Sequence, residues 1–294
     1  MMPDDELADA ELIVGTVAEW RRFAKRHQEF VAESPRLAQL ARLLFERDYV
    51  GNKVDHVISS LGYLCWQDFQ EILTLAGNGH GFGALKILRG FFERLVTLRY
   101  LQDNPGEVEV FCQFEHVRSY KMANEIHQTL GEDYMPAEKL AEYKAARDKV
   151  KADFMRECTC AKDCPHQVPM HTWTVLDPVA MAGKVDNGLR KHAFAAYYMP
   201  LMETHPTLGA IASRQSFAEG GGMSFAEERQ KAQDNADWAV CMAHTMMLNA
   251  LGTELEHFPD LQPTAGQIFE NAKAAFMSIW DESKQPTAAL SSGL

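Results

Sequence analysis

The sequence has no long apolar run and no excess of positive charge, and each absence excludes a class of protein. No stretch approaches the ~18 consecutive apolar residues of a membrane-spanning helix. The 294 residues carry a formal net charge of −12, which opposes non-specific binding to nucleic-acid phosphates. The first eleven residues are acidic, where a secretory signal is basic and then apolar. We therefore expect a cytoplasmic protein with no membrane partner.

Common enzyme motifs are also missing. The chain contains no G-x-x-x-x-G-K-[ST], no G-x-G-x-x-G, no H-E-x-x-H and no G-x-S-x-G. Their absence argues against P-loop NTPases, Rossmann dehydrogenases, zincin proteases and α/β hydrolases. The chain has only six cysteines, too few at this length for a secreted disulfide framework. Three of them, Cys65, Cys112 and Cys241, stand singly in apolar helical patterns and are predicted to be buried thiols.

Helical periodicity is present almost throughout the chain. Apolar residues at helical spacing predict helices over residues 9–31, 36–48, 52–76, 82–102, 105–130, 136–157, 178–183, 187–199, 224–258 and 263–283. Ser34-Pro35 is typical of a helix start, and Ser224-Phe-Ala-Glu227 fits a capping box. No strand-like alternation persists. We predict an all-α fold, an irregular multi-helix bundle with an inserted Cys/His-rich loop.

Proline and glycine positions suggest how this bundle is divided. We expect N-terminal helices over residues 1–49 and a helical core domain over 50–215, which includes the Cys/His loop at 158–174. A C-terminal helical pair over 223–283 is expected to pack on the core. The last residues, 284–294, have the composition of a disordered tail.

The Cys/His loop is the strongest local signal. Cys158, Cys160 and Cys164 fall within seven positions and are followed by His166. Thiolates and imidazoles are the ligands that Zn²⁺ prefers, and four of them close a tetrahedral structural site. The first pair, however, has one intervening residue where zinc loops usually have two. The segment is therefore either a structural zinc site formed by these four residues or a surface loop with reduced thiols.

Two charged residues, Arg89 and Glu93, lie four positions apart on the most apolar helix of the chain. Charged groups on a buried helix are costly unless they are paired. We therefore predict either a buried ion pair that fixes the helix register or the polar floor of a pocket. Tyr120, Tyr198 and His205 complete the candidate catalytic or binding site. His205 precedes Pro206 and is expected at a helix start, where a neutral imidazole can act as a base.

A family resemblance rests on the same helix. The stretch Ala84-Leu-Lys-Ile-Leu-Arg-Gly-Phe-Phe-Glu93, with Tyr100-Leu101, resembles a bacterial family of all-helical proteins of unknown function. Its members share an A-L-x-L-x-R-x-x-x-E helix, a following Tyr-Leu, and a later Tyr followed by His, which Tyr198 and His205 match. The resemblance covers residues 50–215 and implies a helical fold without a settled activity. It does not extend to the chemistry of the Cys/His loop.

Three kinds of function are compatible with these patterns. The first is an interaction protein, expected to be a homodimer, in which the polar pairs are structural. The second is a ligand-sensing protein with a small molecule at Arg89, Glu93, Tyr120 and His205. The third is a nucleic-acid- or nucleotide-processing enzyme in which Arg89 holds phosphate and His205 acts as the base. A HEPN-like ribonuclease belongs to this class, and its signature of Arg, four to six residues and His occurs as Arg21 or Arg22 with His27, on what we expect to be a solvated basic face.

Overall fold

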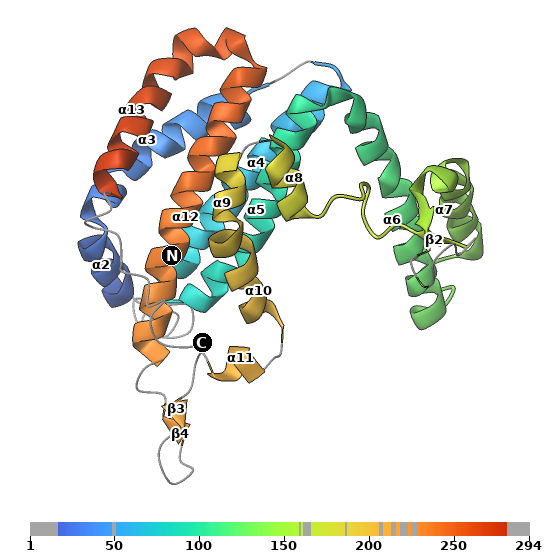
Figure 1. Ribbon diagram of the computed structural model, residues 1–294, viewed down its shortest axis with the longest axis horizontal. Coiled ribbons are helices and arrows are strands. Elements are labelled where there is room, and N and C mark those ends of the chain that lie inside the picture. Colours follow the sequence, from blue (N-terminus) through green and yellow to red (C-terminus); the bar gives the residue numbers. More distant parts are fainter. Residues whose placement is uncertain are drawn as a thin grey trace. The chain divides into compact units, whose positions relative to one another are not determined.

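The computed structural model of the protein describes residues 17–48, 51–158, 160, 166–185, 187–205, 208–212, 216–217, 223–224 and 228–280. These residues confirm an all-α fold, with two short hairpins as the only strands in the described ranges (Figure 1). Tertiary contacts divide the chain into two compact units, residues 1–102 with 178–294 and residues 103–177. The boundaries expected from the sequence at residues 49 and 215 were placed from proline and glycine positions and not from tertiary contacts, so they stay predictions. Within the described ranges, no helix is long and apolar enough to span a bilayer.

The first unit contains most of the helices and one small antiparallel hairpin. Its elements are α2 (Val17–Arg26), α3 (Gln28–Phe45), α4 (Lys53–Gly77), α5 (Gly81–Asp103), α8 (Pro178–Val185), α9 (Asn187–Ala193), η3 (Phe194–Tyr198), α10 (Met199–Thr204), α11 (Leu208–Ala212), β3 (Ser216–Phe217), β4 (Met223–Ser224), α12 (Glu228–His257), η4 (Pro259–Leu261), η5 (Gln262–Gly266) and α13 (Gln267–Ile279).

The core of this unit lies along α4, α5 and α12. The prediction that residues 82–102 form a buried central helix is confirmed, because α5 buries ten side chains or glycines along its length. It begins directly against α12: a Cβ at Gly81 would lie 1.9 Å from the Ala232 carbonyl oxygen, so only glycine fits there. Cys65 is fully buried in this core as predicted, whereas Cys112 and Cys241 are only partly buried.

The first two helices meet at a different place from the one predicted. The sequence suggested a break at Ser34-Pro35, but α3 runs through Pro35 and the break falls at His27. Proline has no N–H to donate to the carbonyl four residues earlier. Here the Ser34 hydroxyl donates to that carbonyl, on Val31, at 2.8 Å, so the helix continues with its acceptor satisfied. The break places His27 at the junction of α2 and α3.

A second proline, Pro200, also lies inside a helical rod that was predicted to end before it. The rod continues from α9 through the π-helix η3 into α10 and ends at Thr204. Within η3, Met199 N–H donates to the Phe194 carbonyl, and in that register the Ala195 carbonyl faces Pro200, which has no N–H. The indole Nε1 of Trp238 on α12 donates to the Ala195 oxygen at 3.3 Å. The widened turn and this indole therefore accommodate the proline.

The predicted capping box at residue 224 is wrong. Ser224 pairs with Ser216 in the β3–β4 hairpin, and α12 begins at Glu228. The glycine triplet at 220–222 and the expected tail at 284–294 lie outside the described residues.

The second unit is a helical pair with a hairpin. It contains η1 (Pro105–Glu107), α6 (Val108–Leu130), α7 (Ala137–Val150), η2 (Lys151–Phe154), β1 (Met155–Glu157) and β2 (Gln167–Pro169). The helix predicted over 136–157 ends at Val150, and its last three residues form β1, which pairs antiparallel with β2. Its small core is aromatic: the rings of Phe114 and Phe154 meet edge to face with their centroids 5.2 Å apart.

Candidate functional site

The predicted pair of Arg89 and Glu93 forms, but it is not buried. Arg89 Nε lies 3.0 Å from Glu93 Oε1, and the two side chains are 26% and 41% exposed. The expectation of a buried pair is therefore wrong. The inner faces of α5 are filled by its apolar residues, which leaves these two charges on its remaining outer stripe. A half-exposed pair of this kind contributes little to stability.

An aromatic side chain missed by the sequence analysis connects this pair to Tyr198. The Arg89 guanidinium lies 4.9 Å from the centroid of the Tyr197 ring, a cation–π contact. Tyr197 also meets Tyr198, at a centroid distance of 5.3 Å, and Phe92 on α5, at 6.0 Å. Arg89, Glu93 and Tyr198 are thus brought into one cluster through Tyr197. Its position next to Tyr198 in the sequence was the available signal.

Two of the predicted residues lie elsewhere. Tyr120 belongs to the second unit, where the guanidinium of Arg147 lies 4.0 Å from its ring centroid. His205 is exposed and follows the end of α10; residues 206 and 207 lie outside the described residues, so the expectation that it starts a helix stays a prediction. Its φ of −106° and ψ of 147° are extended because Pro206 disfavours the helical conformation in the preceding residue. The catalytic roles assigned to these residues stay predictions.

Residues 158–166 of the Cys/His loop form the connection between β1 and β2. The register places Cys158 opposite His166, and Cys158 N–H donates to the His166 carbonyl at 2.8 Å. The Cys160 N–H points to the Cys158 sulfur at 3.4 Å, while Cys164 lies outside the described residues. In the described part of the chain, no three His, Cys, Asp or Glu side chains are arranged to hold a metal. The donor set still suits zinc, so the four-ligand site stays a prediction.

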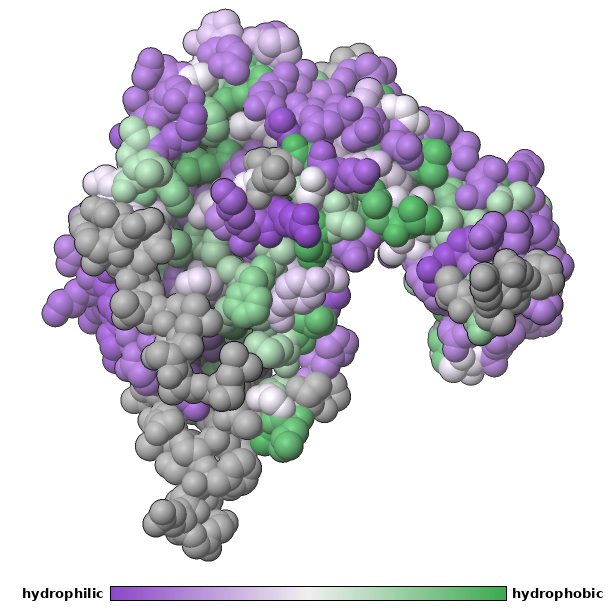
Figure 2. All heavy atoms as spheres, in the orientation of Figure 1, coloured by the Kyte–Doolittle hydropathy of each residue, from purple (hydrophilic) through white to green (hydrophobic). Residues whose placement is uncertain are grey.

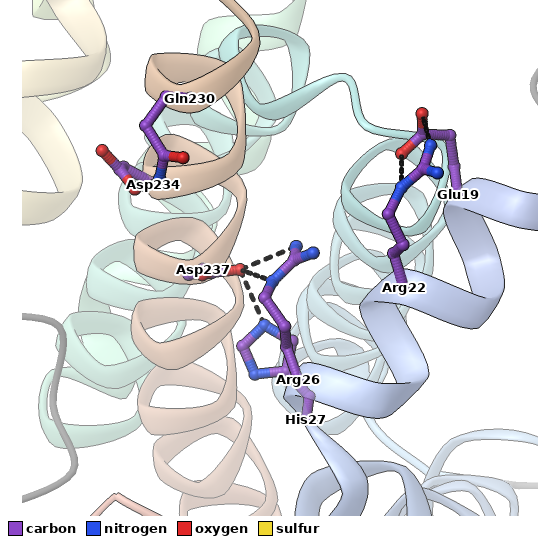
Figure 3. A network of polar contacts seen from close by, with 7 residues as sticks. All are labelled: Glu19, Arg22, Arg26, His27, Gln230, Asp234 and Asp237. Carbon is purple, nitrogen blue, oxygen red and sulfur yellow. Dashed lines mark hydrogen bonds and ion pairs between the residues drawn. The ribbon is translucent and has the colours of Figure 1, made fainter.

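A polar network between α2 and α12 was not predicted (Figure 3). His27 Nε2 lies 2.8 Å from Asp237 Oδ1, and Arg26 Nη2 lies 3.1 Å from the same oxygen. The His27 side chain is only 9% exposed, so the expected solvated basic face does not include it. Beside this network Arg22 pairs with Glu19 within α2. Since His27 and Asp237 are 210 residues apart, no local sequence pattern links them.

Charged and polar groups inside the core of the first unit were also missed. Asp68 on α4 is buried and accepts from Arg94 on α5. Burial raises the pKa of Glu254 on α12 to about 7, although Arg47 Nη2 lies 3.6 Å from its carboxylate. Burial lowers the pKa of His244 to about 3, and its Nδ1 accepts from the Trp280 indole at 2.9 Å. These groups are enclosed by the packing of the first unit.

The fold defines an all-helical protein in which Arg89, Glu93 and Tyr198 cluster around Tyr197. The chain belongs to the family of unknown function DUF5677, whose family model matches residues 55–218, more than half of its length. The match confirms the resemblance suggested by the α5 motif and includes Arg89, Glu93, Tyr198 and His205. It does not include α2, α12 or their polar network. Neither the curated proteins nor the solved structures contain a match to the chain.

Proposed function

We propose that this protein is an interaction protein that forms a homodimer through an apolar face of its first unit. This face carries large apolar side chains on η3, α10 and α11 that are between 46% and 76% exposed: Phe194, Tyr198, Met202, Leu208 and Ile211. Figure 2 shows hydrophobic residues exposed over α10 and α11. Monomeric proteins rarely expose contiguous apolar surface beyond a few hundred Å², and larger patches mark interaction sites.

The spacing of these residues supports a face and not a scatter of single side chains. Phe194, Tyr198 and Met202 follow one another at four-residue intervals along the rod formed by η3 and α10. The opposite side of the same rod is buried by Ala196 and Pro200. A helix with apolar residues on opposite sides is typical of one packed between two layers. Because α12 supplies one layer, a second layer is expected on the exposed side.

The composition and size of the face favour a second copy of the chain as its partner. Aromatic residues, Met and Arg are enriched in protein interfaces, and Arg89 with Tyr197 borders Tyr198. The five side chains expose on the order of 500 Å² of apolar surface. Each partner of a standard interface buries roughly 800 Å² including its polar rim. A two-fold arrangement would place this patch against itself.

The test is the oligomeric state of the full chain. Sedimentation velocity over a range of concentrations should show a dimer, and Phe194→Glu should weaken dimerisation by at least about 30-fold, as expected for a charge in the centre of an interface. Tyr134→Glu is a matched control, because Tyr134 is 70% exposed but belongs to the second unit. It should leave the dimer intact.

Two outcomes would overturn the proposal. One is a wild-type chain that remains monomeric at every concentration measured. The other is a dimer that tolerates both Phe194→Glu and Met202→Glu, since a charge at two central positions must disrupt an apolar contact. Unchanged thermal melting of both variants is the control for folding.

The alternative of a nucleic-acid- or nucleotide-processing enzyme that uses Arg89 and His205 has less support. Arg89 is already engaged by Glu93 and Tyr197, and His205 is exposed at the end of α10. A general base must lie within hydrogen-bond reach of the atom that it deprotonates, beside the group that binds the substrate.

A further inference from the structure

The basic character of α2 is unusual for this acidic chain. Five of the seven residues from 21 to 27 are basic or histidine, namely Arg21, Arg22, Lys25, Arg26 and His27, whereas the whole chain has a net charge of −12. One acidic residue, Glu19, lies in the same helix. Positive charge is therefore concentrated at one place in the first unit, outside the segment matched by the family model.

Asp237 on α12 holds two of these side chains in fixed positions. Its Oδ1 accepts from Arg26 Nε at 3.3 Å and Nη2 at 3.1 Å, and it lies 2.8 Å from His27 Nε2. Figure 3 shows both side chains reaching towards Asp237 on α12, and the Arg22 side chain pairing with Glu19 farther along α2. A single carboxylate thus orients a guanidinium and an imidazole, and Arg22 adds a second guanidinium nearby.

Two hollows open on either side of Arg26, which lines both of them. One, of about 490 Å³, is also lined by Glu19, Arg22, Asn78, His80 and Gln233, and small residues such as Ala232 and Ala236 leave its floor open. The other, of about 530 Å³, is lined by Lys25, His27, Glu29, Phe30, Asp237 and Trp280. The first hollow therefore offers several hydrogen-bond donors, and the second has two aromatic side chains with both basic and acidic groups around them.

This arrangement fits a phosphate group better than a neutral or cationic ligand. Guanidinium groups donate to phosphate oxygens in pairs, and imidazole and amide groups add further donors. The Arg22–Glu19 pair is exposed and three residues apart, so redirecting Arg22 to a ligand loses little stability. Arg26 is held by Asp237 through Nε and Nη2 and lines both hollows.

We propose that the groove between α2 and α12 binds a phosphorylated small molecule, with the phosphate at Arg22 and Arg26 and a flat apolar part beside Trp280. The interaction of Arg26 and His27 with Asp237 keeps the donors in place. This site is separate from the apolar face on η3, α10 and α11, so it does not depend on the proposed dimer.

The experiment is isothermal titration of the full chain with two probes, inorganic phosphate and adenosine monophosphate. Wild-type protein should bind the nucleotide, and Arg22→Gln should weaken binding by about tenfold, as expected for a lost charge-assisted hydrogen bond. Arg26→Gln should weaken it at least as much. Lys273→Gln is the matched control, because Lys273 forms an exposed pair with Glu270 at the same three-residue spacing.

The two probes separate the sources of phosphate. Tighter binding of the nucleotide indicates that the apolar hollow contributes, and equal affinities indicate a site for free phosphate. The proposal is overturned if neither probe binds, or if Arg22→Gln and Arg26→Gln both bind as the wild type does. Since Arg22 is exposed, its variant folds even where Arg26→Gln loses stability.

Discussion

The first unit buries several charged or titratable side chains, whereas the charged helix α7 of the second unit buries none. The first unit buries Asp68, Glu254 and His244 in its core. In the second unit, α7 is rich in charge and buries none of its residues. Several charged or titratable side chains of the first unit are therefore part of its core, whereas those of α7 lie at the surface. Enclosed charges require partners of fixed geometry, and surface charges do not.

The pKa values of two aspartates illustrate this contrast. Burial raises the pKa of Asp68, even though Arg94 acts to lower it. The pKa of Asp148 in α7 is lowered, chiefly by its hydrogen bond to Arg147. Desolvation therefore has the largest effect on the pKa of Asp68, whereas the hydrogen bond to Arg147 has the largest effect on the pKa of Asp148.

The largest expected effect concerns Glu254 and pH. Since its pKa is raised from 4.5 to about 7, the folded protein binds this proton more tightly than the unfolded chain does. Its contribution is fully present below pH 4.5 and is lost as the pH rises through 7, an effect of about 3 kcal/mol. Urea unfolding as a function of pH should show this loss in the wild type and not in Glu254→Gln.

His244 acts in the opposite direction, so the comparison with Glu254→Gln is required. The pKa of His244 is lowered to about 3, and the stability it contributes above pH 6.5 falls as the pH decreases. This contribution is common to wild type and variant and cancels in their difference. A difference that stays constant from pH 4.5 to 8 would contradict the role of Glu254.

A smaller effect is expected for Asp68→Ala, which removes the buried partner of Arg94. Arg94 is 41% exposed and regains water, so the free energy of unfolding should fall by about 2 kcal/mol and not by the larger amount seen for fully buried pairs. The matched change in the second unit, Asp148→Ala, should leave stability unchanged within error. Equal effects in chemical denaturation would remove the distinction between the units.

The smallest effect on the stability of the whole chain is expected at the Cys/His loop, where the change is confined to the β1–β2 hairpin. We propose that Cys158, Cys160, Cys164 and His166 bind one structural zinc. The metal would stabilise the β1–β2 hairpin of the second unit, whose core is small. Elemental analysis should find one zinc per chain, lost in Cys158→Ser and retained in Cys112→Ser. Chelation should accelerate amide hydrogen exchange in β1 and leave α5 unchanged. Purified protein without a transition metal would exclude the site.

The helices were predicted best where apolar periodicity is long. Residues 52–76 and 82–102 correspond closely to α4 and α5, because both are wrapped by the core along their whole length. Two of the errors occur at prolines. Pro35 and Pro200 were read as helix breaks, yet the Ser34 hydroxyl and the Trp238 indole satisfy the carbonyls involved. The indole comes from a distant helix and leaves no mark in the local sequence.

For the candidate site, local spacing predicted the contact between Arg89 and Glu93 but not its exposure. Exposure depends on which face of α5 its neighbours cover. Local spacing could not predict the network of Arg26, His27 and Asp237, because its carboxylate comes from the distant helix α12.

The amino-acid order alone determined the helical class, the central apolar helix, the Cys/His cluster and the family. The helical class and the central helix follow from apolar residues spaced a few positions apart, and the cluster and the family follow from short local motifs. Tertiary structure decided which charged groups are buried and that His27 pairs with Asp237. It also decided which apolar side chains remain exposed on η3, α10 and α11. Burial depends on how distant helices pack against one another, and each of these outcomes depends on burial.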